Sequence, residues 1–393
     1  MGAVAEPPTP CRRQNELACP PVRLLFFGTY DSAVHPRVAV LRDGLLVAGV
    51  EIDECNAPLG LSTSDKVEML RHAWKAPRLA VSILRAWCRL TYRSMGFHQR
   101  HARPDAVVVG YLGHFDVHLA RLLFPRTPIV LDHLIGATST AVDRGLDTGL
   151  KTRLLRSVDR WALRAAHLVV VDTDEQLGSL DPHVRRKAVV VPVGAPDAWF
   201  RDVHEHDDTD LSVVFFGLFT PLQGTPVIGG AIASLVDTTI QFTMIGSGQD
   251  LVEAKRAAGD SQRVTWIDWV DGDDLPDVVA HHDVCLGIFG TSPKAQSVVP
   301  NKVFQGAAAG CAIVTSDTPP QRRVLGEAAV YVPPGDPAAL AAALRQLADH
   351  RGTLHALRHR GNDLARQDFT PSAVVRVLLT RIDALIAQHA RHD

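Results

Sequence analysis

Residues 294–318, KAQSVVPNKVFQGAAAGCAIVTSDT, hold the pattern from which the fold of this chain follows. The run just before them, DVCLGIF at 283–289, is short, apolar and followed by Gly290, which predicts a buried strand. Residues 311–315 predict the next strand. Between the two, Asn301 is a predicted N-cap and Gly310 a predicted stop, so a short helix connects the strands.

The start of this helix predicts a site for an anion. The free N–H groups of a helix N-terminus carry partial positive charge and suit a phosphate. Lys302 adds a full positive charge in the first turn, where a cation is otherwise unfavourable, and this mismatch points to an anionic ligand. A solvated surface lysine is the alternative interpretation.

Composition limits the class of protein. A chain of 393 residues predicts about two domains, and a hydrophobic content of 46% is enough for packed cores. The formal net charge of −2 gives no sign of a nucleic-acid partner. Apolar runs fall well short of the roughly 18 residues of a membrane span. Six scattered cysteines without a CxxC pair predict a reduced, cytoplasmic protein without structural zinc.

Strands and helices alternate along the first half of the chain. The predicted strands are residues 22–27, 50–52, 106–109, 128–131, 168–171 and 188–193. This alternation predicts a doubly wound parallel sheet, with function at the carboxyl ends of its strands. Residues 1–21 are polar, contain five prolines and lack the apolar core of a secretion signal, so we expect a disordered tail.

The pattern then restarts after an acidic stretch, DVHEHDDTD at 202–210, which predicts a linker. New strands are predicted at residues 211–216, 241–245, 264–267, 283–289, 311–315 and 329–332. We therefore predict an α/β fold with two Rossmann-like domains facing a cleft, one at 22–201 and one at 211–370. A last helix in 371–393 is expected to pack back on the first domain.

Six motifs in this order resemble the carboxyl half of family-four glycosyltransferases, which have the GT-B fold. They are FFGLFTPLQG, FTMIGSGQ, VTWIDWV, LGIFGTSPKAQSVVPNKVFQGAAAG, VTSDTPPQRRVL and VYVPPGDPAALAAAL. In the amino half, FFGTYDSAVHPR, YLGHFD, IVLDH and Asp143-Arg144 are similar to one subgroup, which also carries PLQG and PNK. The resemblance implies transfer of a sugar from a nucleotide-diphosphate sugar to an acceptor hydroxyl. It also implies retention of anomeric configuration, with no metal and no cofactor.

Departures from the family pattern affect the donor site. The family places Arg and Lys after the first strand of the second domain, where this chain has Leu218 and Gln223. Two glutamates of the family's donor loop correspond here to Ser297 and Gln305. We infer that Lys302 and Lys294 supply the charge for the diphosphate, while Gln305 accepts from a ribose hydroxyl without charge assistance. The alternative is a weakened or noncatalytic module of the same fold that binds nucleotide or a partner.

The candidate donor-binding residues come from both domains. Gly28 allows a sugar phosphate to approach the backbone closely, with Thr29 beside it. Trp269 and Val270 are candidates to flank the nucleotide base, with a core position as the alternative for the tryptophan. The full set is Gly28, Thr29, Gln223, Gly246, Ser247, Trp269, Val270, Phe289, Gly290, Lys294, Ser297, Asn301, Lys302 and Gln305.

His114 is the leading candidate on the acceptor side, because it follows a strand and a glycine and has Asp116 two residues on. Its ring or carbonyl would stabilise positive charge that develops near the anomeric carbon, and capping of a helix is the alternative. Asp116 and Asp132 complete the candidate catalytic set, with Tyr30 and Arg37 on the acceptor side. The absence of GxxxxGK[ST], HExxH and GxSxG motifs argues against an NTPase of the P-loop type, a zinc protease and a serine hydrolase.

The composition of residues 70–104 predicts a location at a membrane surface. The segment has no Asp or Glu but many Arg and Lys residues, interspersed with Trp74, Trp87, Tyr92 and Phe97. Basic residues beside interfacial aromatic residues are typical of a segment that lies on an anionic membrane. This predicts binding at the inner face of the membrane and a lipid-linked acceptor. The alternative is a solvated basic face, or a groove for a small soluble acceptor.

Overall fold

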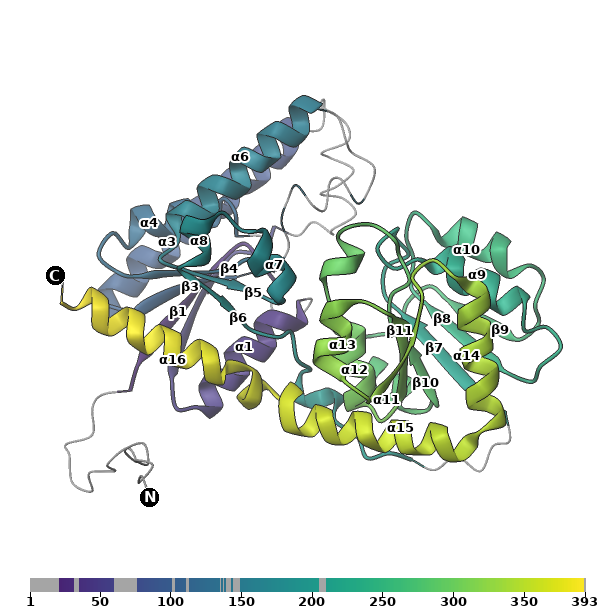
Figure 1. The fold of residues 1–393 in the computed structure, drawn as a ribbon. Coiled ribbons are helices and arrows are strands. Elements are labelled where there is room, and N and C mark those ends of the chain that lie inside the picture. Colours follow the sequence, from purple (N-terminus) through teal and green to yellow (C-terminus); the bar gives the residue numbers. More distant parts are fainter. Residues whose placement is uncertain are drawn as a thin grey trace, which may run out of the picture.

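The structure is a computed structural model, and it describes residues 21–31, 35–59, 76–100, 103–110, 113–134, 136, 138, 143, 149–204 and 210–391. Within these residues the chain forms two α/β domains that lie next to each other (Figure 1). Each domain contains a six-stranded sheet in which all strand pairs are parallel. The predicted fold class is therefore confirmed.

The first sheet has the strand order β2-β1-β3-β4-β5-β6. Its strands are β1 (Arg23–Gly28), β2 (Glu51–Asn56), β3 (Ala106–Val109), β4 (Ile129–Asp132), β5 (Leu168–Val171) and β6 (Ala188–Val190). The helices around it are α1 (Pro36–Val47), α3 (Ala76–Arg100), α4 (Asp116–Leu123), α6 (Gly149–Ala165), α7 (Asp174–Ser179) and α8 (Pro182–Arg185). The central strands are apolar and buried, as expected for a sheet covered on both faces.

Two strands of this sheet differ from their predicted lengths. Strand β2 runs to Asn56, past the predicted end at residue 52, because it lies at the sheet edge, where polar residues such as Asp53 are tolerated. Strand β6 stops at Val190, before the predicted end at residue 193. Pro192 has no N–H to donate to a neighbouring strand.

The second sheet has the order β12-β11-β10-β7-β8-β9. Its strands are β7 (Ser212–Phe216), β8 (Gln241–Ile245), β9 (Val264–Ile267), β10 (Val284–Leu286), β11 (Ala312–Ser316) and β12 (Ala329–Val332). Its helices are α9 (Thr225–Ala233), α10 (Leu251–Ala258), α11 (Leu275–Ala280), α12 (Asn301–Ala308), α13 (Pro319–Leu325), α14 (Pro337–Asp349) and α15 (Arg351–Leu364). Short 3-10 turns, η2 (Asp197–Trp199) and η3 (Ala295–Ser297), complete the connections.

Helix α12 lies close against β10, as its small residues predict. A Cβ atom on Gly306 would lie 2.6 Å from Sγ of Cys285, so this packing requires glycine. Gly310 has a φ of 83° and follows the helix as the predicted stop. The predicted N-cap is displaced by one residue: Pro300 is the N-cap, without a side-chain hydrogen bond, and Asn301 is the first helical residue.

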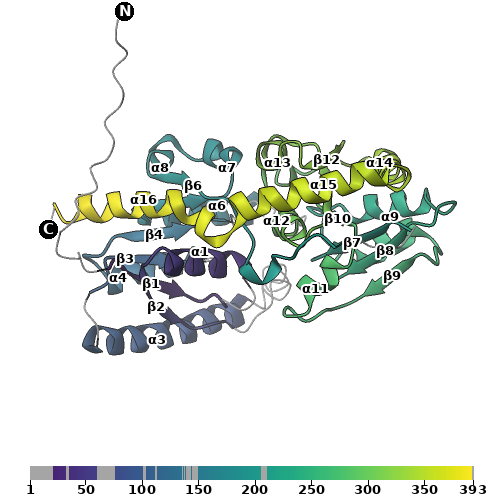
Figure 2. The ribbon, with the colours of Figure 1, turned by 90° about the horizontal axis from the view of Figure 1, so that it is seen from below.

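The chain passes between the domains twice. The first passage follows β6, and the second leads from α15 through a π-helical segment, η4 (Ala365–Phe369), into α16 (Pro371–His389). The two passages touch, because Ala195 N–H donates to the carbonyl of Phe369 at 2.9 Å. Helix α16 lies along the first domain beside α1, with buried residues such as Val375 and Leu378 in the core of that domain (Figure 2). The predicted return of the last helix is thus confirmed.

Candidate functional site

The carboxyl edge of the first sheet faces the loop of residues 290–300 in the second domain, which we call the donor loop. Thr173 follows β5, and its Oγ1 donates to the carbonyl of Ser297 at 2.7 Å. Ser292 Oγ donates to Oδ1 of Asp143 at 2.5 Å. These contacts bring the predicted acceptor side and the predicted donor side together at one interface.

Ion pairs hold the two domains together next to these hydrogen bonds. Arg323 on α13 contacts Glu175 at 2.8 Å and Asp174 at 3.3 Å, and both acids belong to α7. The three side chains are partly exposed, so each pair contributes little free energy of unfolding. They serve mainly to fix the relative position of the domains.

Two turns that contain glycine lie at the carboxyl edge of the second sheet. Gly217 follows β7 and Gly246 follows β8, with φ angles of 127° and 125° that favour glycine. A Cβ atom on Gly246 would lie 2.0 Å from the carbonyl oxygen of Gly217, so the two turns are in direct contact. Gly217 is exposed, which leaves backbone without a Cβ open to a ligand, and Ser247 beside the second turn is exposed as well.

Lys302 lies directly beneath the Gly217 turn. Its Nζ donates to Oε1 of Gln223 at 2.5 Å and lies 3.6 Å from the centre of the Phe215 ring. A Cβ atom on Gly217 would lie 3.4 Å from the same nitrogen. Lys302 is 4% exposed, and burial lowers its pKa from 10.5 to about 7. The alternative interpretation of a solvated surface lysine is therefore wrong.

The two positions that carry glutamate in the resembling family have different surroundings here. Ser297 Oγ donates to the carbonyls of Pro293 and Lys294, each at 3.1 Å, so this side chain stabilises the donor loop. Gln305 is buried in α12, while Asn301 in the first turn is half-buried. Lys294 also lies in the donor loop, and its charge acts on Asp172 of the first domain.

Four other donor candidates divide into core and surface. Phe289 is fully buried, and a Cβ on Gly290 would lie 2.3 Å from the carbonyl oxygen of Pro221, so both residues fix the PLQG loop. Trp269 is 78% exposed after the edge strand β9, and the alternative of a core position is wrong. Val270 packs against the apolar cluster that α12 forms with the second sheet.

On the acceptor side His114 belongs to a buried cluster of three titratable residues. Its Nε2 lies 3.1 Å from Oδ1 of Asp159 on α6, and its ring packs edge-on against His133 with 5.3 Å between centres. Burial opposes the charge of Asp159, but the hydrogen bond and charge of His114 outweigh it and hold the pKa of this carboxyl well below its usual range. Burial, and next the charge of His114, lower the pKa of His133 to about 4.

Asp116 ties the Gly28–Thr29 loop to helix α3. Its Oδ2 accepts from both the N–H and Oγ1 of Thr29, each at 2.8 Å, and its Oδ1 accepts from the indole of Trp87 at 2.9 Å. Both oxygens thus accept hydrogen bonds that position the Gly28–Thr29 loop, and the catalytic role of Asp116 stays a prediction. Tyr30 next to this loop is 2% exposed, so it contributes to the core of the first domain.

Arg37 and Asp132 form a buried ion pair. Nε of Arg37 lies 2.9 Å from Oδ1 of Asp132, and each side chain is 2% exposed. The Nη1 atom of Arg37 donates to the carbonyls of Val191 and Pro192, which fixes the end of β6. Both residues therefore support the carboxyl edge of the sheet from within. Acceptor binding by Arg37 and catalysis by Asp132 stay predictions.

Asp159 and Asp172 are the site residues that the sequence did not single out. Asp172 follows β5 and is 7% exposed, and burial raises its pKa to about 7, against the lowering effect of Arg37. Its place after a buried strand, beside Thr173, is a signal for a functional carboxylate. Asp159 has no such signal, because it lies within helix α6 between the basic residues Arg156 and Arg160. In the part of the chain that the structure describes, no group of three or more His, Cys, Asp or Glu side chains has the arrangement of a metal site.

A family model matches most of the second domain. Residues 210–350 match the family model described as "Glycosyl transferases group 1". No curated protein matches the sequence. The region matched includes the Gly217 turn, the donor loop and Lys302.

Solved structures match across both domains. Sucrose-phosphate synthase from Thermosynechococcus elongatus is 15% identical with a TM-score of 0.70, covering 94% of this chain and 100% of its own. The Anabaena protein Alr3699/HepE in complex with UDP-glucose is 13% identical with a TM-score of 0.60, covering 94% and 100%. An Escherichia coli structure titled "Trehalose-6-phosphate", bound with UDP-2-fluoro glucose, is 14% identical with a TM-score of 0.64, covering 92% and 98%. The chain thus has the two-domain GT-B fold of glycosyltransferases, and its second domain matches the group 1 family of these enzymes.

Proposed function

We propose that this protein transfers a sugar from a nucleoside-diphosphate sugar to an acceptor hydroxyl, with retention and without a metal. The observation that carries the proposal is the position of Lys302, a buried amine under an exposed glycine turn in the domain that matches the family. A lone buried amine has a high free-energy cost, so a ligand that compensates its charge is the natural explanation. Several structures of the same fold contain UDP or a UDP-sugar, which supports this class of donor.

The donor diphosphate would lie between Lys302 and the N-terminus of α12. The first turn of that helix has no side-chain cap, so the N–H groups that precede Val303 would serve phosphate oxygens, while Val303 N–H donates to the carbonyl of Pro300. An arriving diphosphate stabilises the charged amine and raises the pKa of Lys302 from about 7. Donor binding therefore takes up a proton at pH values above 7, and the ammonium then stabilises the leaving diphosphate. In this arrangement Lys302 and the helix terminus supply the positive charge that Arg and Lys supply to the diphosphate in the resembling family.

On the acceptor side His114 would contact the transferred sugar. Asp159 lies 3.1 Å from the imidazole nitrogen and holds the ring in one orientation. Asp116 keeps the Gly28–Thr29 backbone in place beside it. These contacts let the ring polarise a sugar hydroxyl while the acceptor oxygen attacks.

We further propose that the acceptor is lipid-linked and that α3 lies on an anionic membrane. A shallow groove of about 380 Å³ runs along α3 and is lined mainly by apolar atoms of Leu84, Trp87, Cys88, Thr91, Tyr92, Met95 and Leu119. Tyr92 is 81% exposed, and Arg85 and Arg89 are exposed on the same helix. Trp87 connects the groove to the acceptor side through Asp116. None of the helices that the structure describes is long and apolar enough to span a bilayer, so contact would be at the surface.

Calorimetry with UDP tests the donor site. Lys302→Met, which keeps the length of the side chain, should weaken binding about 10- to 100-fold, as for a lost charge-assisted contact. Lys255→Met is the matched control, because Lys255 also lies over an aromatic ring, that of Trp266, but is exposed. Equal affinity of the Lys302 variant and the wild type would contradict the assignment.

Sugar release separates an enzyme from a noncatalytic module. The loss of both family glutamates favours the module as a second candidate. A panel of nucleoside-diphosphate sugars should contain one whose sugar is released or transferred, with loss of that activity in His114→Ala. Binding of a nucleotide without any release across the panel would favour the module.

Vesicle sedimentation tests the membrane contact. We expect binding to vesicles with anionic lipid and not to neutral vesicles, with loss in the variant Arg85→Glu with Arg89→Glu. Arg256→Glu on α10, an exposed arginine in the second domain, is the control. Absence of binding to anionic vesicles at low salt would favour a soluble acceptor.

A further inference from the structure

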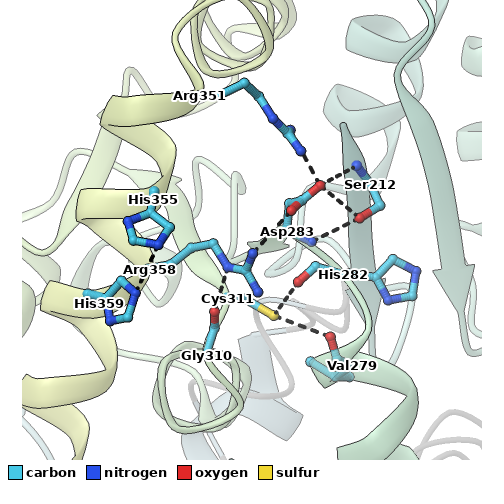
Figure 3. Close-up of polar contacts among 10 residues, drawn as sticks. All are labelled: Ser212, Val279, His282, Asp283, Gly310, Cys311, Arg351, His355, Arg358 and His359. Atoms are coloured by element: carbon cyan, nitrogen blue, oxygen red, sulfur yellow. Dashed lines mark hydrogen bonds and ion pairs between the residues drawn. The ribbon is translucent and has the colours of Figure 1, made fainter. Parts of the chain in front are cut away.

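Helix α15 presents a pair of histidines away from the interface between the domains. His355 and His359 are one helical turn apart and both exposed, and their Nε2 atoms are 3.1 Å from each other. Figure 3 shows the two rings together on one side of α15, while Arg358 extends from the helix toward Asp283 and Gly310. In such a contact one ring nitrogen donates and the other accepts, so at least one imidazole is neutral.

The distance between the two nitrogens fits a shared metal ion. Zinc–nitrogen bonds are about 2.0–2.1 Å long. Two nitrogens 3.1 Å apart, each at that distance from one ion, subtend roughly 95–100° at the ion. This angle lies between those of square-planar and tetrahedral coordination, so the distance between the two nitrogens need not change on binding.

The helix that carries the pair is rigid, which lowers the free-energy cost of organising the ligands. On its buried side Arg358 donates to the carbonyl of Gly310 at 2.9 Å and lies 3.3 Å from Oδ1 of Asp283. One turn further on, Asn362 donates to the carbonyls of Arg201, Ala307 and Ala308. A site on a fixed helix keeps its geometry better than a site on a loop.

We propose that His355 and His359 form a binding site for a first-row transition-metal dication, with water in the remaining coordination positions. Neutral imidazole is a preferred ligand of Zn²⁺, Ni²⁺ and Cu²⁺, and the usual order of affinities predicts that Cu²⁺ binds most tightly. Two protein ligands alone make an open, exchangeable site. A bound ion would join two successive turns of α15 and stabilise this helix shortly before the π-helical segment at Ala365–Phe369.

The test uses the full chain without a purification tag and titrates it with Cu²⁺, Ni²⁺ and Zn²⁺. The chain has 18 histidines, so background binding must be measured separately. The variant His359→Gln with Arg360→His keeps that number but places the second ring out of register. His350→Gln, near the start of the same helix, is the control for an unrelated exposed histidine.

The wild type and His350→Gln should bind one more equivalent than the out-of-register variant, at an affinity at least about tenfold higher than the background. Electron paramagnetic resonance of the Cu²⁺ form should show two equatorial nitrogens, and the midpoint of thermal unfolding should rise with Ni²⁺ only when the pair is intact. Identical metal isotherms for the wild type and the out-of-register variant would overturn the proposal, and so would an absence of metal binding by the wild type. Circular dichroism of each variant verifies that α15 still forms.

Discussion

Replacing Lys302 by methionine should make the protein more stable and at the same time impair donor binding. Burial lowers the pKa of Lys302 from 10.5 to about 7. At 1.36 kcal/mol per pH unit, this corresponds to about 5 kcal/mol against the charged amine. The contacts with Gln223 and Phe215 offset part of that cost. A methionine of similar length removes the cost without leaving a cavity, so we expect a net gain of about 1–3 kcal/mol in the free energy of unfolding.

The pH dependence gives this prediction a distinctive form. The folded pKa of Lys302 lies below the unfolded value, so the unfolded chain binds more protons between about pH 7 and 10.5. Below pH 7 the buried charged amine therefore lowers the free energy of unfolding of the wild type by its full amount. This cost disappears as the pH rises toward 10.5. The advantage of Lys302→Met should follow the same course, large at pH 6.5 and absent near pH 10.5.

Differential scanning calorimetry at several pH values measures this directly. A gain of 1–3 kcal/mol corresponds to a rise of about 2–12 °C in the unfolding midpoint of a domain of this size. Lys255→Met should show no comparable change, because Lys255 is exposed. A lower midpoint for Lys302→Met at pH 6.5, or a difference from the wild type that does not vary with pH, would refute the reasoning.

Three further predictions concern the donor site, the metal requirement and acid stability. Gln305→Glu restores the family's carboxylate and should tighten binding of UDP in calorimetry if the site is merely weakened; markedly weaker binding would mean that the amide makes a different contact. Turnover should survive EDTA, because Lys302 and the α12 terminus supply the charge that Mg²⁺ would otherwise provide; recovery of a lost activity by Mg²⁺ or Mn²⁺ would contradict this. Because the pKa of His133 falls from 6.5 to about 4, the folded state binds fewer protons in that window and loses up to about 3 kcal/mol as the pH falls through it. His133→Phe should flatten the urea midpoint between pH 6.5 and 4, whereas a slope equal to that of the wild type would assign acid sensitivity to other groups.

The strands could be predicted where burial is complete. Residues 168–171 and 241–245 have the predicted bounds, because a continuous apolar run between turn residues has few other stable conformations. The bounds of strand β2 were harder to predict, because its sequence EIDECN contains no apolar run. The strand forms by parallel pairing with β1. The N-terminus of α12 was displaced by one residue, because Pro300 takes the N-cap position without a side-chain hydrogen bond and Asn301 becomes the first helical residue.

The site was less predictable because its contacts join residues far apart in the sequence. The burial of Lys302 depends on Phe215 and Gln223, which come from the first strand and first loop of the domain. The partner of His114 is Asp159 on α6, where the surrounding basic residues give it the appearance of an ordinary surface acid. Trp269 is the opposite case: a large aromatic residue after a strand is usually buried, and its exposure here agrees with the surface position that flanking a base requires.

The double passage of the chain between the domains limits how they can move. A single connection would leave the domains free to turn in any direction, whereas two connections that touch remove most of these degrees of freedom. Here the hydrogen bond from Ala195 to Phe369, and those from Asn362 and Arg366 to the carbonyl of Arg201, bind the two passages to each other. We therefore expect any relative movement of the domains to be mainly a rotation about an axis through this crossing. Interdomain contacts such as that between Thr173 and Ser297 would then separate and re-form along one path, so a donor that binds as proposed would meet the same arrangement each time.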